Sequence, residues 1–218
     1  MSRPRLPPAS RNAAGPTRRA VSQGVAGRQS VRIIAGRWRG RRLTFPVVEG
    51  LRPTPDRVRE TLFNWLQGHC AGARVLDLFA GSGALGLEAL SRGAASAVLV
   101  ERHPAAAAQL RSSLATLGID TAGAAPVQVV QADGYRYLEG AVAVVDLVFL
   151  DPPFADGRED ELCKLLIERG WLAPGGSLYV EHAASRAVPV WPAGLRSWRE
   201  GRAGDVVFHL LRREPAAP

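Results

Sequence analysis

Cysteine is scarce in this chain of 218 residues, which contains only Cys70 and Cys163. Neither belongs to a Cys-x-x-Cys pair or to a Cys/His cluster, because His69 beside Cys70 stands alone. This usage is typical of free thiols in a reducing compartment, and it offers no spacing for a zinc site. We therefore expect a cytoplasmic protein with no disulfide bond and no metal site.

Long apolar runs are also missing. The longest stretch, residues 141–150, is too short to span a bilayer and is interrupted by Asp146. The start of the chain carries arginines and prolines, without the apolar segment of a secretory signal. The sequence therefore predicts no association with a membrane, while its 46% apolar content supports a core of ordinary size.

Acidic residues are absent from residues 1–42, which contain 11 arginines. The formal net charge of the whole chain is +8, so the rest of the chain is slightly acidic. A basic block of this kind commonly meets phosphate backbones. Residues 1–28 are rich in Arg, Pro, Ala and Gly, and we expect them to form a disordered basic extension.

Residues 29–70 are predicted to form a hairpin and a helix that face RNA. Two short runs, residues 31–35 and 41–45, flank a glycine-bounded link and indicate paired strands. A helix then begins with Thr54 as its cap and carries one apolar face. The arginines around a stackable ring and off the apolar face are the candidate RNA-binding residues: Arg37, Trp38, Arg39, Arg41, Arg42, Arg57 and Arg59. Alternatively, the tryptophan packs on the domain and the arginines are solvated.

Residues 71–214 alternate between strand and helix patterns and are expected to form the catalytic domain. The predicted strands cover residues 74–79, 97–101, 127–131, 144–150 and 177–181, and the predicted helices cover residues 84–91, 104–117, 135–138 and 158–169. Two further runs, residues 195–199 and 206–211, indicate an antiparallel pair. This order predicts an α/β, Rossmann-like fold with a seven-stranded, mostly parallel sheet that has one antiparallel strand.

The most informative stretch is an apolar strand that ends at Asp151 and is followed by Pro152, Pro153 and Phe154. The prolines hold Asp151 extended at the carboxyl end of the strand, where open α/β sheets bind ligands. Because the prolines have no N–H, the corner offers only acceptors, which suit a planar base with an exocyclic amino group. The Phe154 ring can stack on such a base. Taken alone, the same residues could be only a strand-ending turn.

A glycine loop follows Asp77 at the end of the first predicted strand of this domain. Residues 81–86 match the dinucleotide fingerprint G-x-G-x-x-G, and Glu101 at the end of the next strand matches its ribose-binding acid. The Asp77 carboxylate, four residues before Gly81, suits a ligand with an ammonium and a sulfonium better than a pyrophosphate. Both a nicotinamide cofactor and S-adenosylmethionine stay open at this point.

The segments Asp-Leu-Phe-Ala-Gly-Ser-Gly at residues 77–83 and Asp-Pro-Pro-Phe at residues 151–154 resemble motifs I and IV of class I S-adenosylmethionine-dependent methyltransferases. Together with residues 32–40, 52–66 and 81–93, they are similar to the bacterial 16S ribosomal RNA guanine-N2 methyltransferase family, often called RsmD. The resemblance covers about residues 30–212 and leaves the basic extension outside.

The resemblance implies a role for each matching residue. The methionyl end of S-adenosylmethionine would lie against Asp77, Ala80, Gly81 and Gly83, its ribose against Glu101, and its adenine amino group against Asp133. The target amine would be held by Asp151 and Pro152, with Phe154 stacked on the guanine. From the residues alone, Glu101 could instead be a surface acid and Asp133 a helix cap.

The implied function is methyl transfer from S-adenosylmethionine to the exocyclic N2 of a guanine in 16S ribosomal RNA. We expect a monomer that acts on this RNA, either free or within an assembled small subunit. Asp-Pro-Pro-Phe also fits a nucleic-acid adenine-N6 methyltransferase, and the glycine loop fits a nicotinamide-dependent oxidoreductase. A ribosome-associated RNA binder without activity is disfavoured, because residues 151–154 are intact.

Overall fold

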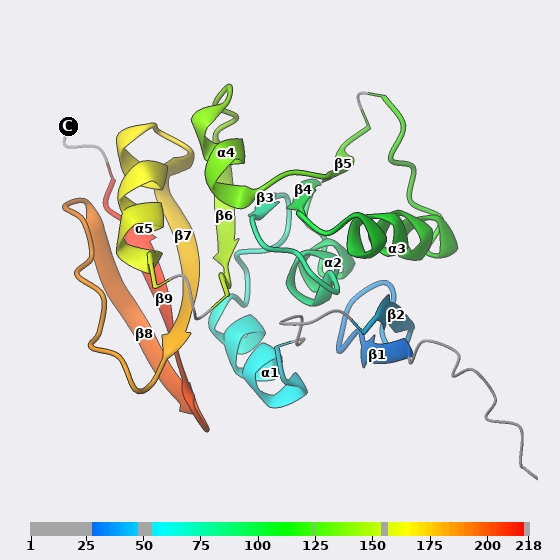
Figure 1. Ribbon diagram of the computed structural model, residues 1–218, viewed down its shortest axis with the longest axis horizontal. Coiled ribbons are helices and arrows are strands. Elements are labelled where there is room, and N and C mark those ends of the chain that lie inside the picture. The colour runs from blue at the N-terminus through cyan, green and yellow to red at the C-terminus, as the bar shows by residue number, and fades with distance from the viewer. Residues whose placement is uncertain (1–27, 48–53, 124, 154–156, 216–218) are drawn as a thin grey trace, which may run out of the picture.

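A computed structural model of the protein describes residues 28–47, 54–123, 125–153 and 157–215 (Figure 1). In these residues a seven-stranded sheet forms the centre of the molecule. Its strands in spatial order are β5 (Val127–Val130), β4 (Ser96–Val100), β3 (Arg74–Asp77), β6 (Val145–Leu150), β7 (Leu172–Ala183), β9 (Val206–Arg213) and β8 (Leu195–Ala203). All run parallel except β9, which is antiparallel to both of its neighbours, so the predicted sheet is confirmed.

The strand order reverses between β3 and β6. The chain passes from β3 outward to β4 and β5, and then returns to β6 on the other side of β3. The connections after β3 and β6 therefore leave in opposite directions, which opens a crevice at the carboxyl ends of these strands. Both strands are almost wholly buried. Strand β6 is a nearly continuous apolar run, as expected for a strand that is covered on both faces of the sheet.

Helices cover both faces of the sheet. One core joins the sheet to α1 (Asp56–Trp65), α2 (Ala84–Ser91) and α3 (Pro104–Thr116). The other core joins it to α4 (Gly134–Glu139) and α5 (Glu159–Glu168). The bounds of α2, α3, α4 and α5 lie within two residues of the predicted bounds. Within the described residues, no helix is both long and apolar enough to cross a membrane.

A separate two-stranded sheet, β1 (Arg28–Arg32) and β2 (Arg42–Pro46), packs over α3. The hairpin is confirmed, but its first strand begins three residues before the predicted start at residue 31. The strand also ends earlier than predicted, at Arg32, because residues 34 and 35 turn their N–H groups to the carboxylate of Glu88 in α2 instead of to β2. The predicted disorder of residues 1–28 lies outside the described residues, apart from the backbone of Arg28.

Strand β7 is longer than predicted. It begins at Leu172, before the Pro-Gly-Gly turn at residues 174–176, and its pairing with β6 shifts register there. The shift places Ser177 opposite Leu147 and leaves the intervening residues as an irregularity in the strand. From Ser177 onward β7 follows β6 closely, and Val180 lies opposite Leu150, the last residue of β6.

Candidate active site

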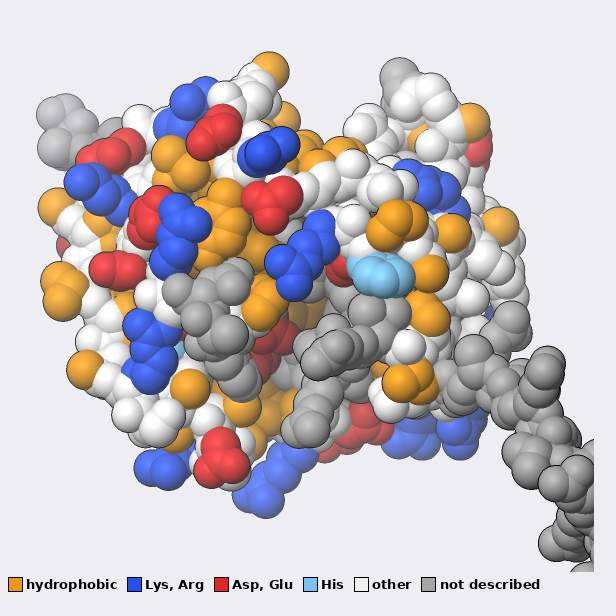
Figure 2. Space-filling view, in the orientation of Figure 1, with side chains coloured by type: hydrophobic (Ala, Val, Ile, Leu, Met, Phe, Trp, Pro, Cys, Tyr) orange, Lys and Arg blue, Asp and Glu red, His pale blue; other side chains and the backbone are white. Residues whose placement is uncertain are grey.

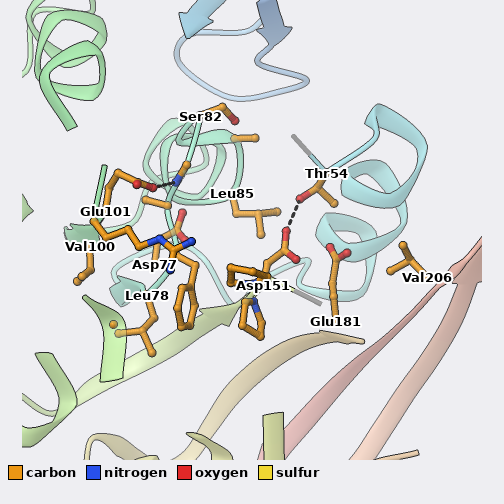
Figure 3. A pocket seen from close by; sticks show the side chains of 18 of the residues that line it. Thr54, Asp77, Leu78, Ser82, Leu85, Val100, Glu101, Asp151, Glu181 and Val206 are labelled. Carbon is orange, nitrogen blue, oxygen red and sulfur yellow. Dashed lines mark hydrogen bonds between the residues drawn. The ribbon is translucent and has the colours of Figure 1, made fainter. Parts of the chain in front are cut away.

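One large cavity opens at the carboxyl ends of the parallel strands. Its volume is about 1210 Å³, which leaves room for more than one small ligand. Residues after β3, β4, β6 and β7 line it, together with the start of α1 and the turn between β8 and β9. Figure 3 shows carboxyl groups from four strand ends around this space: Asp77, Glu101, Asp151 and Glu181.

Asp77 lies at the end of β3, beneath the glycine loop. It is 3% exposed, and its Oδ2 accepts a hydrogen bond of 2.9 Å from the N–H of Gly86 in α2. Burial raises the pKa of Asp77 to about 7, against the opposing effect of that hydrogen bond, and the charges of Asp151 and Glu101 add to the rise. Asp77 thus orients the loop and brings a carboxyl group to the cavity wall.

The glycine loop needs backbone that only glycine adopts readily. Gly81 and Gly83 have φ angles of 51° and 78°, in the left-handed region. Ala80 and Gly81 line the cavity, whereas Gly83 is absent from the described residues that line it. Gly83 is instead the N-cap residue of α2, and a Cβ at this position would lie 2.8 Å from the side chain of Leu87. Its part in ligand binding remains a prediction.

Glu101 lies at the end of β4 and joins that strand to the glycine loop. Its Oε2 accepts from the N–H of Gly81 at 2.9 Å, and its Oε1 accepts from the N–H of His103 at 2.6 Å. The residue is 8% exposed and faces the cavity. The alternative that it is a surface acid is therefore wrong.

Asp133 caps α4. Its Oδ1 accepts from the N–H groups of Tyr135 at 3.1 Å and Arg136 at 3.2 Å. Its neighbours Ala132 and Gly134 line the cavity, but Asp133 is absent from the described lining residues. The structure thus shows the helix cap that the sequence left open, and a contact with an adenine amino group remains a prediction.

Asp151 follows the last residue of β6 and faces the same cavity as the glycine loop. The hydroxyl of Thr54 donates to its Oδ2 at 3.4 Å (Figure 3). The prediction that Thr54 caps α1 is therefore wrong, and Pro55 holds the cap position. Pro152 and Pro153 also line the cavity, whereas the predicted base-stacking residue Phe154 lies outside the described residues.

A further carboxyl group, that of Glu181 two residues before the end of β7, was not among the predicted site residues. It is 3% exposed, lines the cavity, and accepts a hydrogen bond of 2.5 Å from the hydroxyl of Tyr179 on its Oε1. A signal was present in the sequence, because Glu181 ends an apolar strand just as Asp77 and Glu101 do. The sequence predicted that the strand ends at Glu181, but Glu181 was assigned no role in the site.

Burial dominates the electrostatics of this cavity. It raises the pKa of Asp151 to about 7, although the hydrogen bond from Thr54 acts in the opposite direction. Burial also raises the pKa of Glu181 well above its ordinary value, and the charge of Asp151 adds to the rise. The carboxyl groups are therefore hard to ionise together, and a cation or hydrogen-bond donors in the cavity would stabilise their charged forms.

The predicted RNA-binding arginines of the hairpin lie away from the cavity. The N–H of Arg37 donates at 2.7 Å to the carbonyl of Ser91, the last residue of α2, whose first residue Ala84 lines the cavity. The helix between them is roughly 12 Å long. Basic side chains gather just below the β1–β2 hairpin in Figure 2. Among the hairpin side chains that the structure describes, the exposed arginines are Arg32, Arg37, Arg39, Arg41 and Arg42.

Trp38 in the hairpin turn is half-buried and packs against the core. Its N–H donates to Ser91 Oγ at 3.0 Å, and the guanidinium of Arg37 lies 5.2 Å from its ring centroid. The packing that the sequence left as an alternative is therefore present. Arg57 is exposed at the start of α1, two residues after Pro55 at the cavity, so it lies closer to the cavity than the turn does.

Arg59 is not part of a basic surface, and this prediction is wrong. Its side chain is 1% exposed. The guanidinium donates to the carbonyls of Thr54 at 3.2 Å and Arg32 at 2.9 Å, and it lies within ion-pair distance of Asp56 at 2.6 Å and Glu88 at 3.7 Å. A guanidinium with these partners can be buried because its charge and its N–H groups are matched.

Comparisons with known proteins agree with the geometry. The family model described as Conserved hypothetical protein 95 matches residues 31–212. "Ribosomal RNA small subunit methyltransferase D" of Escherichia coli (strain K12) is 48% identical over 189 residues, which are 87% of this chain and 93% of the relative. The protein of the same name from Haemophilus influenzae is 41% identical over 182 residues, covering 84% and 93%.

Solved structures show the same likeness. A methyltransferase from Escherichia coli, yhhF, has a TM-score of 0.77 at 44% identity and covers 85% of this chain and 99% of its own. An RNA methyltransferase from Salinibacter ruber, solved with S-adenosyl-L-homocysteine, has a TM-score of 0.56 at 18% identity, covers 77% and 97%, and shows the shared fold alone. The chain therefore belongs to the Conserved hypothetical protein 95 family, together with the methyltransferases named ribosomal RNA small subunit methyltransferase D.

Proposed function

We propose that the protein transfers a methyl group from S-adenosylmethionine to the exocyclic N2 of a guanine in 16S ribosomal RNA. The observation that carries this proposal is the position of Asp151, just ahead of two prolines, in the same cavity as the glycine loop and Glu101. A pocket for the methyl donor and a corner that holds an amine thus share one space. The class of RNA follows from relatives named ribosomal RNA small subunit methyltransferase D.

The residues of the cavity fit S-adenosylmethionine. At Gly134, which lines the cavity, an added Cβ would come within 3.0 Å of the Leu78 carbonyl and the Phe79 ring, so the wall stays free of a side chain there. Buried carboxyl groups suit an ammonium and ribose hydroxyls. When bound, this molecule supplies a methyl group that its sulfonium already activates toward transfer.

Each proposed contact uses a group that remains available. Both oxygens of Glu101 accept one backbone N–H, and each keeps a second lone pair for a ribose hydroxyl. Asp77, Ala80 and the loop backbone would hold the methionyl end. Asp77 accepts from Gly86 on Oδ2, so its Oδ1 is left for the ligand. Asp133 would reach the adenine amino group from the start of α4.

At the amine corner, Asp151 would accept one N2 hydrogen, and the carbonyl of Pro152 would accept the other. Two acceptors draw the hydrogens out of the base plane and make the nitrogen lone pair available. N2 loses one proton when it gains a methyl group, and Asp151, whose pKa burial raises to about 7, can take up that proton. The Thr54 hydroxyl fixes the carboxylate that does this.

The proposal is tested by methylating 16S RNA, both free and in assembled small subunits, and by identifying the product nucleoside by mass spectrometry. We expect N2-methylguanosine. Asp151→Asn should lower the single-turnover rate by about two orders of magnitude, the scale for losing one electrostatic contact in a catalytic site. The matched control is Asp146→Asn at the start of the same strand, where the side chain pairs with Arg74 on the surface.

Three outcomes would contradict the proposal. N6-methyladenosine as the product would favour the adenine-specific alternative. A near-normal rate for Asp151→Asn would show that this carboxyl group is only structural. Equal losses in Asp151→Asn and Asp146→Asn would assign the effect to the strand as a whole instead of to the amine corner.

A further inference from the structure

Next to the amine corner lies a buried carboxyl group without an assigned role, that of Glu181. Strand β6 is paired with β7 up to its last residue, and Glu181 follows Val180, the partner of Leu150, just as Asp151 follows Leu150. The two carboxyl groups are close enough for the charge of Asp151 to raise the pKa of Glu181. Figure 3 shows both projecting into the same part of the cavity, on the side of Thr54.

The surroundings of Glu181 fix one of its oxygens and leave the other for a ligand. The hydroxyl of Tyr179, which is fully buried, donates to Oε1 at 2.5 Å. A carboxylate can accept several hydrogen bonds on its two oxygens, so Oε2 and a further lone pair of Oε1 remain. A buried carboxyl group held in this way, on the wall of a cavity, is placed to receive a donor that arrives with the substrate.

We infer that Glu181 accepts a hydrogen bond from N1–H of the target guanine and so makes the site select guanine over adenine. This inference rests on the proposed function and extends it to base recognition. In guanine, N1–H lies beside the N2 amino group, so the base presents two neighbouring donors. The strand-end carboxyl groups of Asp151 and Glu181 form two neighbouring acceptors that match them.

Adenine offers a different pattern at the same place. Its N1 beside the N6 amino group is an acceptor, and it would face the ionised Glu181 carboxylate without a hydrogen between them. The N1–H of guanine instead stabilises that ionised form against the effect of burial. Leaving buried polar groups unpaired in this way discriminates strongly between bases that share one amine. The Asp-Pro-Pro-Phe corner alone holds either amine, so this second carboxyl group supplies the difference.

The first test uses the unaltered protein and base analogues. Small-subunit RNA is prepared with guanine, 2-aminopurine or 6-thioguanine at the mapped methylation site. 2-Aminopurine keeps the N2 amine but has an acceptor at N1, whereas 6-thioguanine keeps N1–H and changes only position 6. We expect kcat/KM to fall about 100-fold or more for 2-aminopurine and much less for 6-thioguanine. Equal rates for guanine and 2-aminopurine would overturn the inference.

The second test changes the protein. Glu181→Gln can donate to an acceptor at N1, so it should lower kcat/KM for guanine and reduce the ratio of guanine to 2-aminopurine to a few-fold. Tyr179→Phe removes the hydroxyl that fixes Oε1 of Glu181. It should reduce the ratio of guanine to 2-aminopurine by a smaller factor than Glu181→Gln does. Binding of S-adenosylmethionine, measured by calorimetry, should stay unchanged in both variants. An unaltered base ratio in a folded Glu181→Gln protein would refute the role of Glu181.

The controls separate this inference from the proposed function. If the unaltered protein methylates no guanine in 16S RNA, the proposed function fails before any analogue is compared. If guanine is methylated and both variants keep the ratio of the unaltered protein, only the inference about Glu181 fails. Thermal unfolding of each variant shows whether a lost rate reflects lost structure. The comparison of base analogues uses only the unaltered protein, so it tests the inference even if both variants fail to fold.

Discussion

At the scale of single residues, the carboxyl group of Asp151 is governed by its surroundings more than by its own chemistry. Burial raises its pKa to about 7, and the single hydrogen bond from Thr54 acts against this rise. Such a group changes its charge close to neutral pH, whereas an exposed aspartate would stay ionised at every pH near neutrality. Acids and bases with pKa values near the working pH transfer protons most effectively.

The pH dependence of the reaction follows from this pKa. Below about pH 7 Asp151 is protonated in the folded protein and loses an acceptor for the amine. We expect the single-turnover rate, at saturating RNA and S-adenosylmethionine, to rise as pH increases through about 7 and then to level off. The residual rate of Asp151→Asn should lack this rise. A rate that is flat from pH 5.5 to 8.5 in the unaltered protein would contradict the assignment.

At the scale of secondary-structure elements, the buried ion pair of Arg59 and Glu88 joins three of them. Glu88 in α2 accepts the N–H groups of Ile34 at 2.7 Å and Ala35 at 3.0 Å, just after β1, and it also pairs with Arg92. Arg59 in α1 reaches Glu88 at 3.7 Å. The hairpin, α1 and α2 are thus joined through the buried charges of Arg59 and Glu88.

Removing one partner of this buried pair should destabilise the protein strongly. Arg59→Ala leaves the carboxylate of Glu88 with one cation fewer, and such changes cost about 3–5 kcal/mol. Arg57→Ala, two residues earlier on the exposed side of α1, should change the free energy of unfolding by less than about 0.5 kcal/mol. Urea unfolding of both variants measures the difference. Similar stabilities for the two would show that Arg59 is not an essential partner.

The elements themselves could largely be predicted from the sequence, because apolar runs and glycine turns report on burial and chain reversal directly. Helix α2 and strand β6 lie within one residue of their predicted positions. The fate of Arg59 could not be predicted, since helical spacing separates apolar from polar positions but does not show which polar residue finds a buried partner. Thr54 illustrates the same limit, because its partner Asp151 is 97 residues away.

At the scale of the whole molecule, the exposed arginines of the hairpin lie away from the cavity. The cavity gathers carboxyl groups, while Arg37 and Arg41 of the hairpin contact the far ends of α2 and α3. Arg41 there donates to the carbonyl of Thr116, the last residue of α3. An RNA that reaches both surfaces would be anchored by its phosphates at the hairpin while one base enters the cavity.

Neutralising Arg39, Arg41 and Arg42 together should therefore weaken RNA binding without affecting S-adenosylmethionine. The slope of log affinity against log salt should flatten by about 0.7–0.9 for each lost phosphate contact. Deleting residues 1–27 should leave methylation nearly unchanged at physiological salt. Binding and methyl transfer across a salt series measure both effects. If the deletion abolishes activity while the triple substitution has no effect, the RNA surface lies in the amino-terminal extension.

The buried carboxyl groups also impose a cost on folding. Asp151 binds its proton more tightly in the folded protein than in the unfolded chain, so its contribution to stability falls as pH rises from about 4 to 7. Asp151→Asn should therefore be more stable than the unaltered protein at pH 8, by about 1–3 kcal/mol, and equal to it near pH 4. Thermal unfolding at both values tests this. A gain at pH 4 that equals the gain at pH 8 would exclude ionisation as the cause.

The buried Glu88 has a consequence for protein engineering. Its carboxylate belongs to the predicted catalytic domain, but two of its hydrogen-bond donors and its ion-pair partner Arg59 belong to the segment before it in the chain. The two predicted domains are therefore poor candidates for independent cloning, because cutting the chain at residue 71 would take two N–H donors and one ion-pair partner away from this carboxylate. A chimaera that borrows the hairpin of a relative to redirect RNA choice has to carry the matching first helix along with it.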